Sequence, residues 1–377
     1  MHKLTYGMFI RNARKLLLAR VPFYSPEECA ALAKRMVLSV CASFRQPLQP
    51  ALPANDVQLV LAENEEVPSP VENECEKALE RLCKGEPLEY VLGHAEFCGY
   101  EFRVNASTLI PRPETEELVS IVGEHLRTVI TEAFSGDCGI NGGAAPVVLD
   151  VCTGSGCIVW SLLLDYINGI YDAASIEHIC GQRILEKQPG SKNSRSLNVH
   201  FYGCDISEGA LEVAASQFKA EPVKGGCKLQ SERGLGAGRK HSTNAWPEFF
   251  KCDVLVENAW QIMLQAMGRA CPDIIVCNPP YVCQKERARM RSNVLDWEPS
   301  SALFVPDDNP LIFYEAVADI ALKLAQACDR TKPALFFEIN ESLGSRTIEM
   351  LKSKGFTNAR CLKDLFGKDR FVETVRK

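Results

Sequence analysis

The chain has 377 residues, of which 46% are hydrophobic, and this is enough for roughly two or three globular domains with sizeable cores. Its formal net charge of −6 argues against a protein that binds nucleic acid mainly by neutralising phosphates, although a local basic face remains compatible with it. The 17 cysteines are scattered without any CxxC pair, which indicates free thiols in a reducing compartment rather than a metal site or a disulfide framework.

Residues 1–83 are predicted to form a small helical domain. Its basic start, residues 1–26, contains no Asp or Glu, as in a mitochondrial transit sequence, but its apolar spacing fits an ordinary first helix equally well. Residues 25–28 (Ser-Pro-Glu-Glu) have the pattern of a capped helix start, and another helix is expected over residues 71–82. No catalytic constellation occurs here, so this part is expected to contact a partner or to support the rest of the chain.

A linker is expected over residues 84–113. Within it, residues 97–104 (Phe-Cys-Gly-Tyr-Glu-Phe-Arg-Val) predict a short β-hairpin with its turn near Gly99. Pro111 and Pro113 then hold the chain extended, because proline fixes its own backbone and restricts the residue before it. An amphipathic helix is predicted to follow.

Residues 114–377 alternate between strand and helix patterns, which indicates an α/β fold with a parallel, doubly wound sheet. Strands are expected over residues 147–151, 198–205, 273–277 and 334–339. The most apolar long stretch, 144–164, contains an aspartate and two glycines, so it predicts a strand, a turn and a helix rather than a membrane span. Two interruptions, about residues 171–196 and 221–241, are interpreted as surface insertions.

A glycine-rich turn follows the first of these strands. Its candidate ligand-binding residues are Cys152, Thr153, Gly154, Ser155 and Gly156. Asp205 ends the next strand, where a carboxylate can accept hydrogen bonds from both hydroxyls of a ribose. The third glycine of GxGxxG and the sequence GK[ST] are missing, so the turn favours a cofactor with one nucleoside and a sulfonium over a dinucleotide or a P-loop nucleotide. Asp253 either accepts from an adenine amino group or lies in a solvated turn.

The sequence Asn278-Pro279-Pro280-Tyr281 follows an apolar run, 274–277, that predicts a buried strand. Ligands of open α/β sheets bind at the carboxyl ends of the strands. The Asn278 side-chain oxygen and the Pro279 carbonyl can accept both N–H groups of a primary amide or amine, and Tyr281 can pack on the same planar group. The tetrad therefore predicts alkylation of a planar, amide-like nitrogen, mainly through positioning. The alternative interpretation is a proline-rich strand end that only turns the chain.

Several segments resemble the HemK/PrmC family, the N5-glutamine methyltransferases of class I peptide chain release factors. The resemblance extends from about residue 85 to residue 375. It is most specific in the tetrad 278–281 and in residues 110–116 (Ile-Pro-Arg-Pro-Glu-Thr-Glu). Further similar segments are 85–93, 96–97, 297–299, 302–303, 313–314, 338–339 and 363–370.

The resemblance implies a Rossmann-like fold and an enzyme that transfers a methyl group from S-adenosylmethionine to the glutamine of the Gly-Gly-Gln loop of a release factor. It further implies that residues 152–156 wrap the methionine end of the donor, that Asp205 binds its ribose, and that Asp253 and Val254 lie beside its adenine. Residues 278–281 would hold the substrate glutamine, with Asn278 also next to the donor. The N-terminal helices would grip the release factor, and no metal, membrane or nucleic-acid partner is expected.

Three residues depart from the family pattern. Cys152 stands where glycine is commonest, which is tolerable if its φ angle is negative. Val254 stands where some members have an aromatic residue, and Asn340 stands where glycine is usual. A related branch of the family modifies a glutamine of a ribosomal protein, and residues 112–116 favour the release-factor branch.

Two alternatives from other classes remain open. An adenine-N6 nucleic-acid methyltransferase uses the same tetrad on a flipped base. The acidic net charge and the lack of an evident target-reading domain argue against it, whereas the basic residues near Arg239 support it. A non-catalytic binding protein on this scaffold is disfavoured by the intact tetrad. The expected compartment is mitochondrial or cytoplasmic, and the basic start of the chain favours mitochondria.

Overall fold

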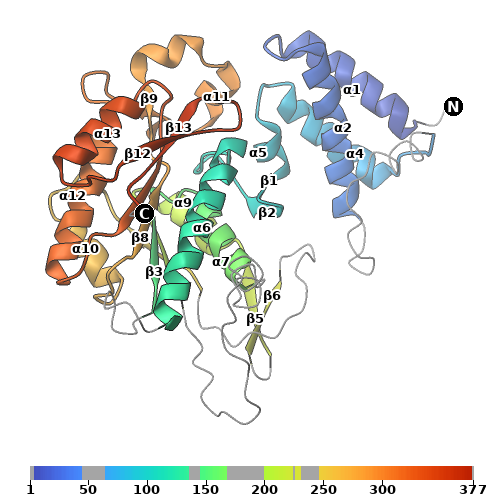
Figure 1. Ribbon diagram of the computed structural model, residues 1–377. Helices are drawn as coiled ribbons and strands as arrows, with labels where there is room; N and C mark the ends of the chain where they lie inside the picture. Colours follow the sequence, from blue (N-terminus) through green and yellow to red (C-terminus); the bar gives the residue numbers. More distant parts are fainter. Residues whose placement is uncertain are drawn as a thin grey trace.

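The computed structural model describes residues 4–44, 64–135, 145–167, 199–223, 226–230 and 246–375. Its N-terminal part consists of the helices α1 (Tyr6–Arg20), α2 (Pro26–Ser43) and α4 (Ser69–Leu82), which lie side by side (Figure 1). Ser25 and Glu28 form the capping box expected at the start of α2. Leu17, Met36 and Leu82, one from each helix, are fully buried in a shared core. The basic start of the chain therefore includes a helix that packs into this core.

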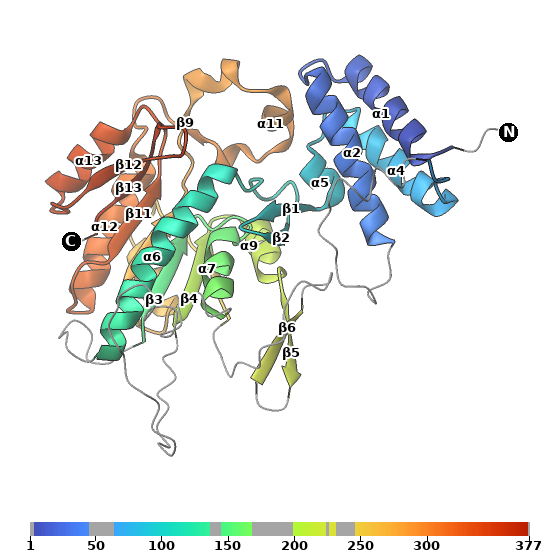
Figure 2. The same ribbon diagram turned by 45° about the vertical axis from the view of Figure 1, so that its right-hand side comes forward.

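Helix α5 (Leu88–Leu92) and the strands β1 (His94–Phe97) and β2 (Tyr100–Arg103) connect this part to the rest of the chain (Figure 2). The two strands pair antiparallel around Cys98 and Gly99, which confirms the hairpin expected from the sequence. Both turn residues have positive φ angles, 51° and 73°, as a two-residue hairpin turn requires.

A seven-stranded sheet with the order β12-β13-β11-β8-β3-β4-β7 forms the centre of the larger part. Its strands are β3 (Val147–Val151), β4 (His200–Asp205), β7 (Glu248–Lys251), β8 (Ile274–Cys277), β11 (Ala334–Glu338), β12 (Arg360–Lys363) and β13 (Asp369–Glu373). The first five run parallel in the order 3-2-1-4-5, which is Rossmann-like. The expected parallel, doubly wound sheet is confirmed for these five strands, whereas at one edge β13 runs antiparallel to both β11 and β12. A short turn joins β12 to β13, and such an antiparallel pair needs no crossover helix.

Helices cover both faces of this sheet (Figures 1 and 2). One face carries α6 (Pro113–Ser135) and α7 (Cys157–Ile167), and the other carries α10 (Ala259–Ala266), α12 (Ile312–Ala327) and α13 (Gly344–Ser353). Successive strand residues point to opposite faces, so Ile274 packs with α6 and α7 whereas Ile275 packs with the other three helices. The short helix α9 (Glu208–Ala215) follows β4, and Ser207 is its N-cap.

The chain between β8 and α12 forms an excursion at the carboxyl ends of the strands (Figure 2). It contains β9 (Val282–Cys283), the 3₁₀ helix η1 (Gln284–Arg289), α11 (Ser292–Trp297), the 3₁₀ helix η2 (Ser300–Ala302) and β10 (Phe304–Val305). β9 and β10 pair in parallel, which ties the two ends of the excursion together.

The expected insertion at 171–196 lies outside the described residues. Of the insertion at 221–241, the described part belongs to a hairpin of β5 (Lys219–Val223) and β6 (Gly226–Gln230). No helix within the described ranges is long and apolar enough to cross a membrane.

The expectation that all cysteines are free thiols is wrong for one pair, because Cys271 and Cys328 form a disulfide. They are 57 residues apart, in the segment before β8 and directly after α12, and only the packing of α12 against the sheet brings them together. No local spacing in the sequence could have indicated this pair. Twelve further cysteines among the described residues are free thiols.

Candidate active site

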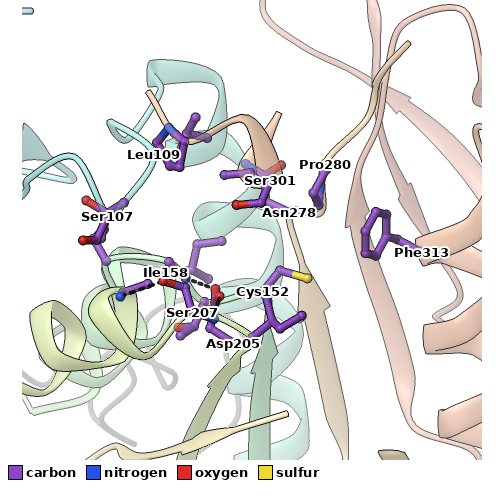
Figure 3. Close-up of a pocket in the computed structure, with 18 of the residues that line it drawn as sticks. Ser107, Leu109, Cys152, Ile158, Asp205, Ser207, Asn278, Pro280, Ser301 and Phe313 are labelled. Atoms are coloured by element: carbon purple, nitrogen blue, oxygen red, sulfur yellow. Dashed lines mark hydrogen bonds between the residues drawn. The ribbon is translucent and has the colours of Figure 1, made fainter. Parts of the chain in front are cut away.

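A pocket of about 330 Å³ opens at the carboxyl ends of β3, β4 and β8. This is the position where the strand order reverses, the usual ligand site of an open α/β sheet. Nine of the predicted site residues line it: Cys152, Thr153, Gly154, Ser155, Asp205, Asp253, Val254, Asn278 and Pro280. In Figure 3, Cys152, Asp205 and Ser207 lie on one side of the pocket and Asn278 and Pro280 on the other. Gly156, Pro279 and Tyr281 do not line it.

The glycine-rich turn is held by hydrogen bonds to two aspartates, Asp150 of β3 and Asp205 of β4. The buried Asp150 accepts a hydrogen bond from Thr153 Oγ1 at 2.6 Å, and Gly154 N donates to Asp205 Oδ2 at 2.9 Å. Burial raises the pKa of the Asp150 carboxyl to about 7. Gly156 serves packing, because a Cβ there would lie 2.9 Å from a ring carbon of Trp160. The sequence predicts that Gly156 contacts the ligand. In the structure, Gly156 instead lies so close to α7 that there is no room for a side chain.

Cys152 has a φ angle of +59°, so the condition under which a cysteine is tolerated here without strain is not met. A residue with a Cβ in the left-handed region costs about 1–2 kcal/mol relative to glycine. The turn between β3 and α7 imposes this backbone conformation, since Gly154 and Gly156 also have positive φ angles. The thiol of Cys152 consequently becomes part of the pocket wall.

Asp205 is oriented by the backbone around it. Its Oδ2 accepts from Gly154 N and its Oδ1 from Ser207 N, both at 2.9 Å. A carboxylate offers about four lone-pair positions, so each oxygen keeps capacity for a ligand hydroxyl. Burial raises the pKa of Asp205, while the two backbone hydrogen bonds favour its ionised form.

The far end of the pocket is aliphatic. Val254 is buried there, and Ile206 and Leu255 line the pocket while remaining 53% and 44% exposed. Asp253 Oδ1 accepts from Leu255 N at 2.9 Å, which fixes the turn after β7. Ile206 and Leu255 were not predicted as pocket residues. The sequence indicated only that Val254 stands where some family members have an aromatic residue.

Asn278 is oriented by a buried carboxylate. Its Nδ2 donates to Glu338 Oε2 at 3.0 Å and to Thr115 Oγ1 at 3.2 Å. Both amide hydrogens are thereby used, so the polar atom that Asn278 retains for a ligand is Oδ1, which can only accept.

Glu338 is the centre of this network. It is 1% exposed, and its two oxygens also accept hydrogen bonds from Thr115 Oγ1 at 2.7 Å and from the Tyr281 hydroxyl at 2.9 Å. Burial raises the pKa of Glu338, and the donated hydrogen bonds oppose that shift. In the sequence Glu338 stood out only as part of the family resemblance. The pairing of Phe337 with Cys277 in parallel strands is what sets Glu338 beside Asn278.

The segment 110–116 is attached to the excursion by Glu298. Arg112 Nη2 and Ile110 N donate to the two oxygens of Glu298 at 2.6 and 3.2 Å. This attachment places the start of α6, and with it Thr115, against Asn278.

Asn340, which departs from the glycine of the family pattern described above, adds hydrogen bonds next to this network. Its Nδ2 donates to Glu286 Oε2 at 3.1 Å and to the carbonyl oxygen of Tyr281 at 3.3 Å. The side chain therefore links the tetrad to η1.

No histidine or lysine lines the pocket in the described part of the chain. Nor do the described residues include a group of three or more His, Cys, Asp or Glu side chains that could hold a metal ion. What the site offers is a set of fixed hydrogen-bond acceptors in a mostly apolar enclosure, an arrangement suited to positioning a ligand.

Comparison with known proteins finds similar methyltransferases. The PrmC N-terminal domain model matches residues 31–93. A release factor glutamine methyltransferase of Bacteroides thetaiotaomicron is 31% identical over 353 residues, which are 94% of this chain and 95% of that protein. Proteins of the same name from Leptospira interrogans and Bacillus subtilis are 31% and 29% identical, covering 80% and 77% of this chain and 78% and 75% of their own.

A solved structure of the release factor-specific protein-(glutamine-N5) methyltransferase of Alicyclobacillus acidocaldarius has 17% identity and a TM-score of 0.33, covering 72% of this chain and 97% of that chain. The assignment rests on the sequence relatives, which extend over nearly the whole chain. The chain belongs to the release factor glutamine methyltransferase family.

Proposed function

We propose that this protein transfers a methyl group from S-adenosylmethionine to the N5 side-chain amide of the glutamine in the Gly-Gly-Gln loop of a class I peptide chain release factor. The observation that carries the proposal is the fixed amide of Asn278, whose Nδ2 is held by Glu338 and whose Oδ1 remains as an acceptor. The names of the relatives, release factor glutamine methyltransferases, support the choice of acceptor.

The pocket fits the donor. The turn after β3 brings backbone close to a ligand at Gly154, which has a positive φ angle and no side chain, and Asp205 offers acceptors for ribose hydroxyls. The aliphatic side chains of Ile206, Val254 and Leu255 can pack on the flat face of a ring such as adenine. S-adenosylmethionine supplies a methyl group made electrophilic by the positive sulfur.

The acceptor side is formed by residues 278–280, of which Asn278 and Pro280 line the pocket. Asn278 Oδ1 and the Pro279 carbonyl would accept the two N–H groups of the glutamine amide and hold its nitrogen toward the donor. An amide nitrogen is a weak nucleophile because its lone pair is delocalised over the carbonyl group. Two fixed acceptors favour lone-pair character on the nitrogen, and oriented reactants can gain about 7–11 kcal/mol. A new N–C bond would form as the S–CH3 bond of the donor breaks, with S-adenosylhomocysteine as the leaving group. The methylated nitrogen would then lose a proton to solvent, so no strong base is required.

The N-terminal helices α1, α2 and α4 are proposed to contact the release factor away from the active site. They form a packed unit with its own core and carry no catalytic constellation. A mitochondrial or a cytoplasmic release factor is the proposed substrate, and following a C-terminally tagged chain in cells distinguishes the two compartments.

Three acceptors test the proposed function. The purified chain is incubated with labelled methyl donor and a release factor, the same factor with its Gly-Gly-Gln glutamine changed to alanine, or DNA. Label is expected on the first acceptor alone. Label on the alanine variant would show that the acceptor is not the Gly-Gly-Gln glutamine and would reopen the alternative of a ribosomal-protein methyltransferase. Label on DNA would favour an adenine-N6 methyltransferase. Either result contradicts the proposal.

A further inference from the structure

The turn between β12 and β13 carries the two most exposed large apolar side chains among the described residues. Leu365 is 87% exposed and Phe366 is 81% exposed, whereas the next, Ile206, is 53% exposed and lines the donor pocket. Neighbouring apolar residues of this size and exposure usually mark an interaction site. We call Leu365 and Phe366 the hairpin tip.

The hairpin tip is held rigidly although its side chains are exposed. Asp364 Oδ1 accepts from Phe366 N at 3.0 Å and from Lys368 N at 2.9 Å, which fixes the turn from within. Leu365 N donates to the carboxylate of Glu117 in α6 at 3.1 Å. A preorganised apolar pair loses little conformational entropy on binding, which favours its use as an anchor.

The hairpin tip lies beside the acceptor side of the active site. Glu117, which holds Leu365, follows by two residues the Thr115 whose hydroxyl donates to Glu338. On the opposite side of the turn, Arg370 donates to Asp364 at 3.2 Å, and the next residue of β13 pairs with Glu338. Both views of the fold place the β12–β13 hairpin next to β9, directly after the tetrad (Figures 1 and 2).

The basic side chains around the tip form ion pairs with carboxylates of the same chain. The ion pairs are Lys363–Asp369 at 2.9 Å, Lys368–Glu341 at 2.9 Å and Arg370–Asp364 at 3.2 Å. What the turn presents to a partner is therefore apolar rather than charged.

We propose that the hairpin tip is a docking element for the protein substrate, seated in an apolar depression on the release-factor domain that carries the Gly-Gly-Gln loop. This inference rests on the proposed function. A glutamine side chain is only a few bonds long, so the substrate protein must cover the rim of the pocket whenever its amide reaches Asn278. The hairpin tip is hydrogen-bonded to Glu117, two residues after Thr115 of the pocket wall, so the same protein would cover it.

The test compares Leu365→Ser/Phe366→Ser with a matched control, Leu365→Met/Phe366→Tyr, which keeps apolar bulk at both positions. KM and kcat for a release factor, the donor dissociation constant and the thermal unfolding midpoint are measured for both variants and the unchanged chain. The serine variant is expected to raise the KM for the release factor by on the order of tenfold to a hundredfold, because two apolar anchors are lost. Donor affinity, unfolding midpoint and kcat should change less than about twofold, since both side chains are exposed and touch no reacting group.

The control variant is expected to keep the original KM, and the difference between the variants should persist at raised salt, because an apolar contact is not screened. An unchanged KM in the serine variant, or a loss of kcat at unchanged KM, overturns the docking role while leaving the proposed function intact. If the unchanged chain does not methylate the release factor at all, the proposed function fails and the docking role fails with it.

Discussion

Asn278 Nδ2 donates a 3.0 Å hydrogen bond to Glu338 Oε2, and the two residues stand side by side because β8 and β11 are parallel and in register. An asparagine amide that is free to turn presents either its oxygen or its nitrogen. The buried carboxylate, which accepts and cannot donate when ionised, selects the orientation in which Asn278 offers an acceptor. In the proposed reaction this selection decides whether the substrate amide is bound by its N–H groups.

Changing Glu338 to Gln is expected to lower kcat without loss of donor binding. A glutamine keeps the size of the side chain but presents an NH₂ group to one of the three donors, Thr115, Asn278 or Tyr281, so that one hydrogen bond is replaced by a clash of donors. A loss of about 1–3 kcal/mol corresponds to roughly tenfold to hundredfold in kcat. Steady-state kinetics with a release factor measures it, and Glu349→Gln on the exposed side of α13 serves as a control. Unchanged kcat would mean that Glu338 only supports the fold.

Removing the side chain of Asn278 separates substrate binding from donor binding. Asn278→Ala should abolish most turnover, while the donor dissociation constant stays within a few-fold, because Asp205 and the turn 152–156 remain in place. Titration calorimetry with the donor and a single-turnover assay give the two values. A variant that no longer binds the donor would show that Asn278 serves mainly the cofactor.

Changing Cys152 to Gly should stabilise the protein. Its φ angle of +59° is unfavourable for a residue with a Cβ, and relief of this cost exceeds the extra chain entropy of glycine by about 0.5–1 kcal/mol. Cys152→Ala is the control, since it removes the thiol but keeps the strained Cβ and should give no such gain. Chemical denaturation measures both free energies of unfolding, and equal values for the two variants would contradict a strained turn.

Asp150 should make stability depend on pH. Burial raises its pKa to about 7, above the value of about 3.9 expected in the unfolded chain, so the folded state holds a proton that the unfolded state releases. The stabilisation is therefore complete below about pH 4 and is lost as the pH rises toward about 7. Asp150→Asn, which keeps an acceptor for Thr153, should flatten this part of the curve. Urea denaturation between these pH values tests it, and parallel curves for both proteins would contradict the assignment.

Much of the site was predictable because its signals are local. The tetrad 278–281, the glycine-rich turn and Asp205 each follow a strand directly, and parallel strands bring their carboxyl ends to one edge of a sheet. Glu338 was not predictable as a partner of Asn278, because the two are joined only by the register between strands 60 residues apart in the chain. The same holds for the disulfide of Cys271 and Cys328, which depends on the packing of α12.

The remaining errors have physical causes that a one-dimensional pattern does not contain. Strand patterns in the sequence show periodicity but not direction, so neither β13 nor its antiparallel orientation was predicted. The positive φ angle of Cys152 is imposed by the turn, although the residue type favours the opposite sign.

Mass-spectrometric mapping of the transferred methyl group identifies the acceptor atom itself. A release factor is incubated with S-adenosylmethionine and either the unchanged chain or the Asn278→Ala variant, and its peptides are then fragmented. The expected result is one added methyl group on the side-chain nitrogen of the Gly-Gly-Gln glutamine, present with the unchanged chain and absent with the variant. A methyl group on any other residue, or an unmodified glutamine after incubation with the unchanged chain, would contradict the proposed activity.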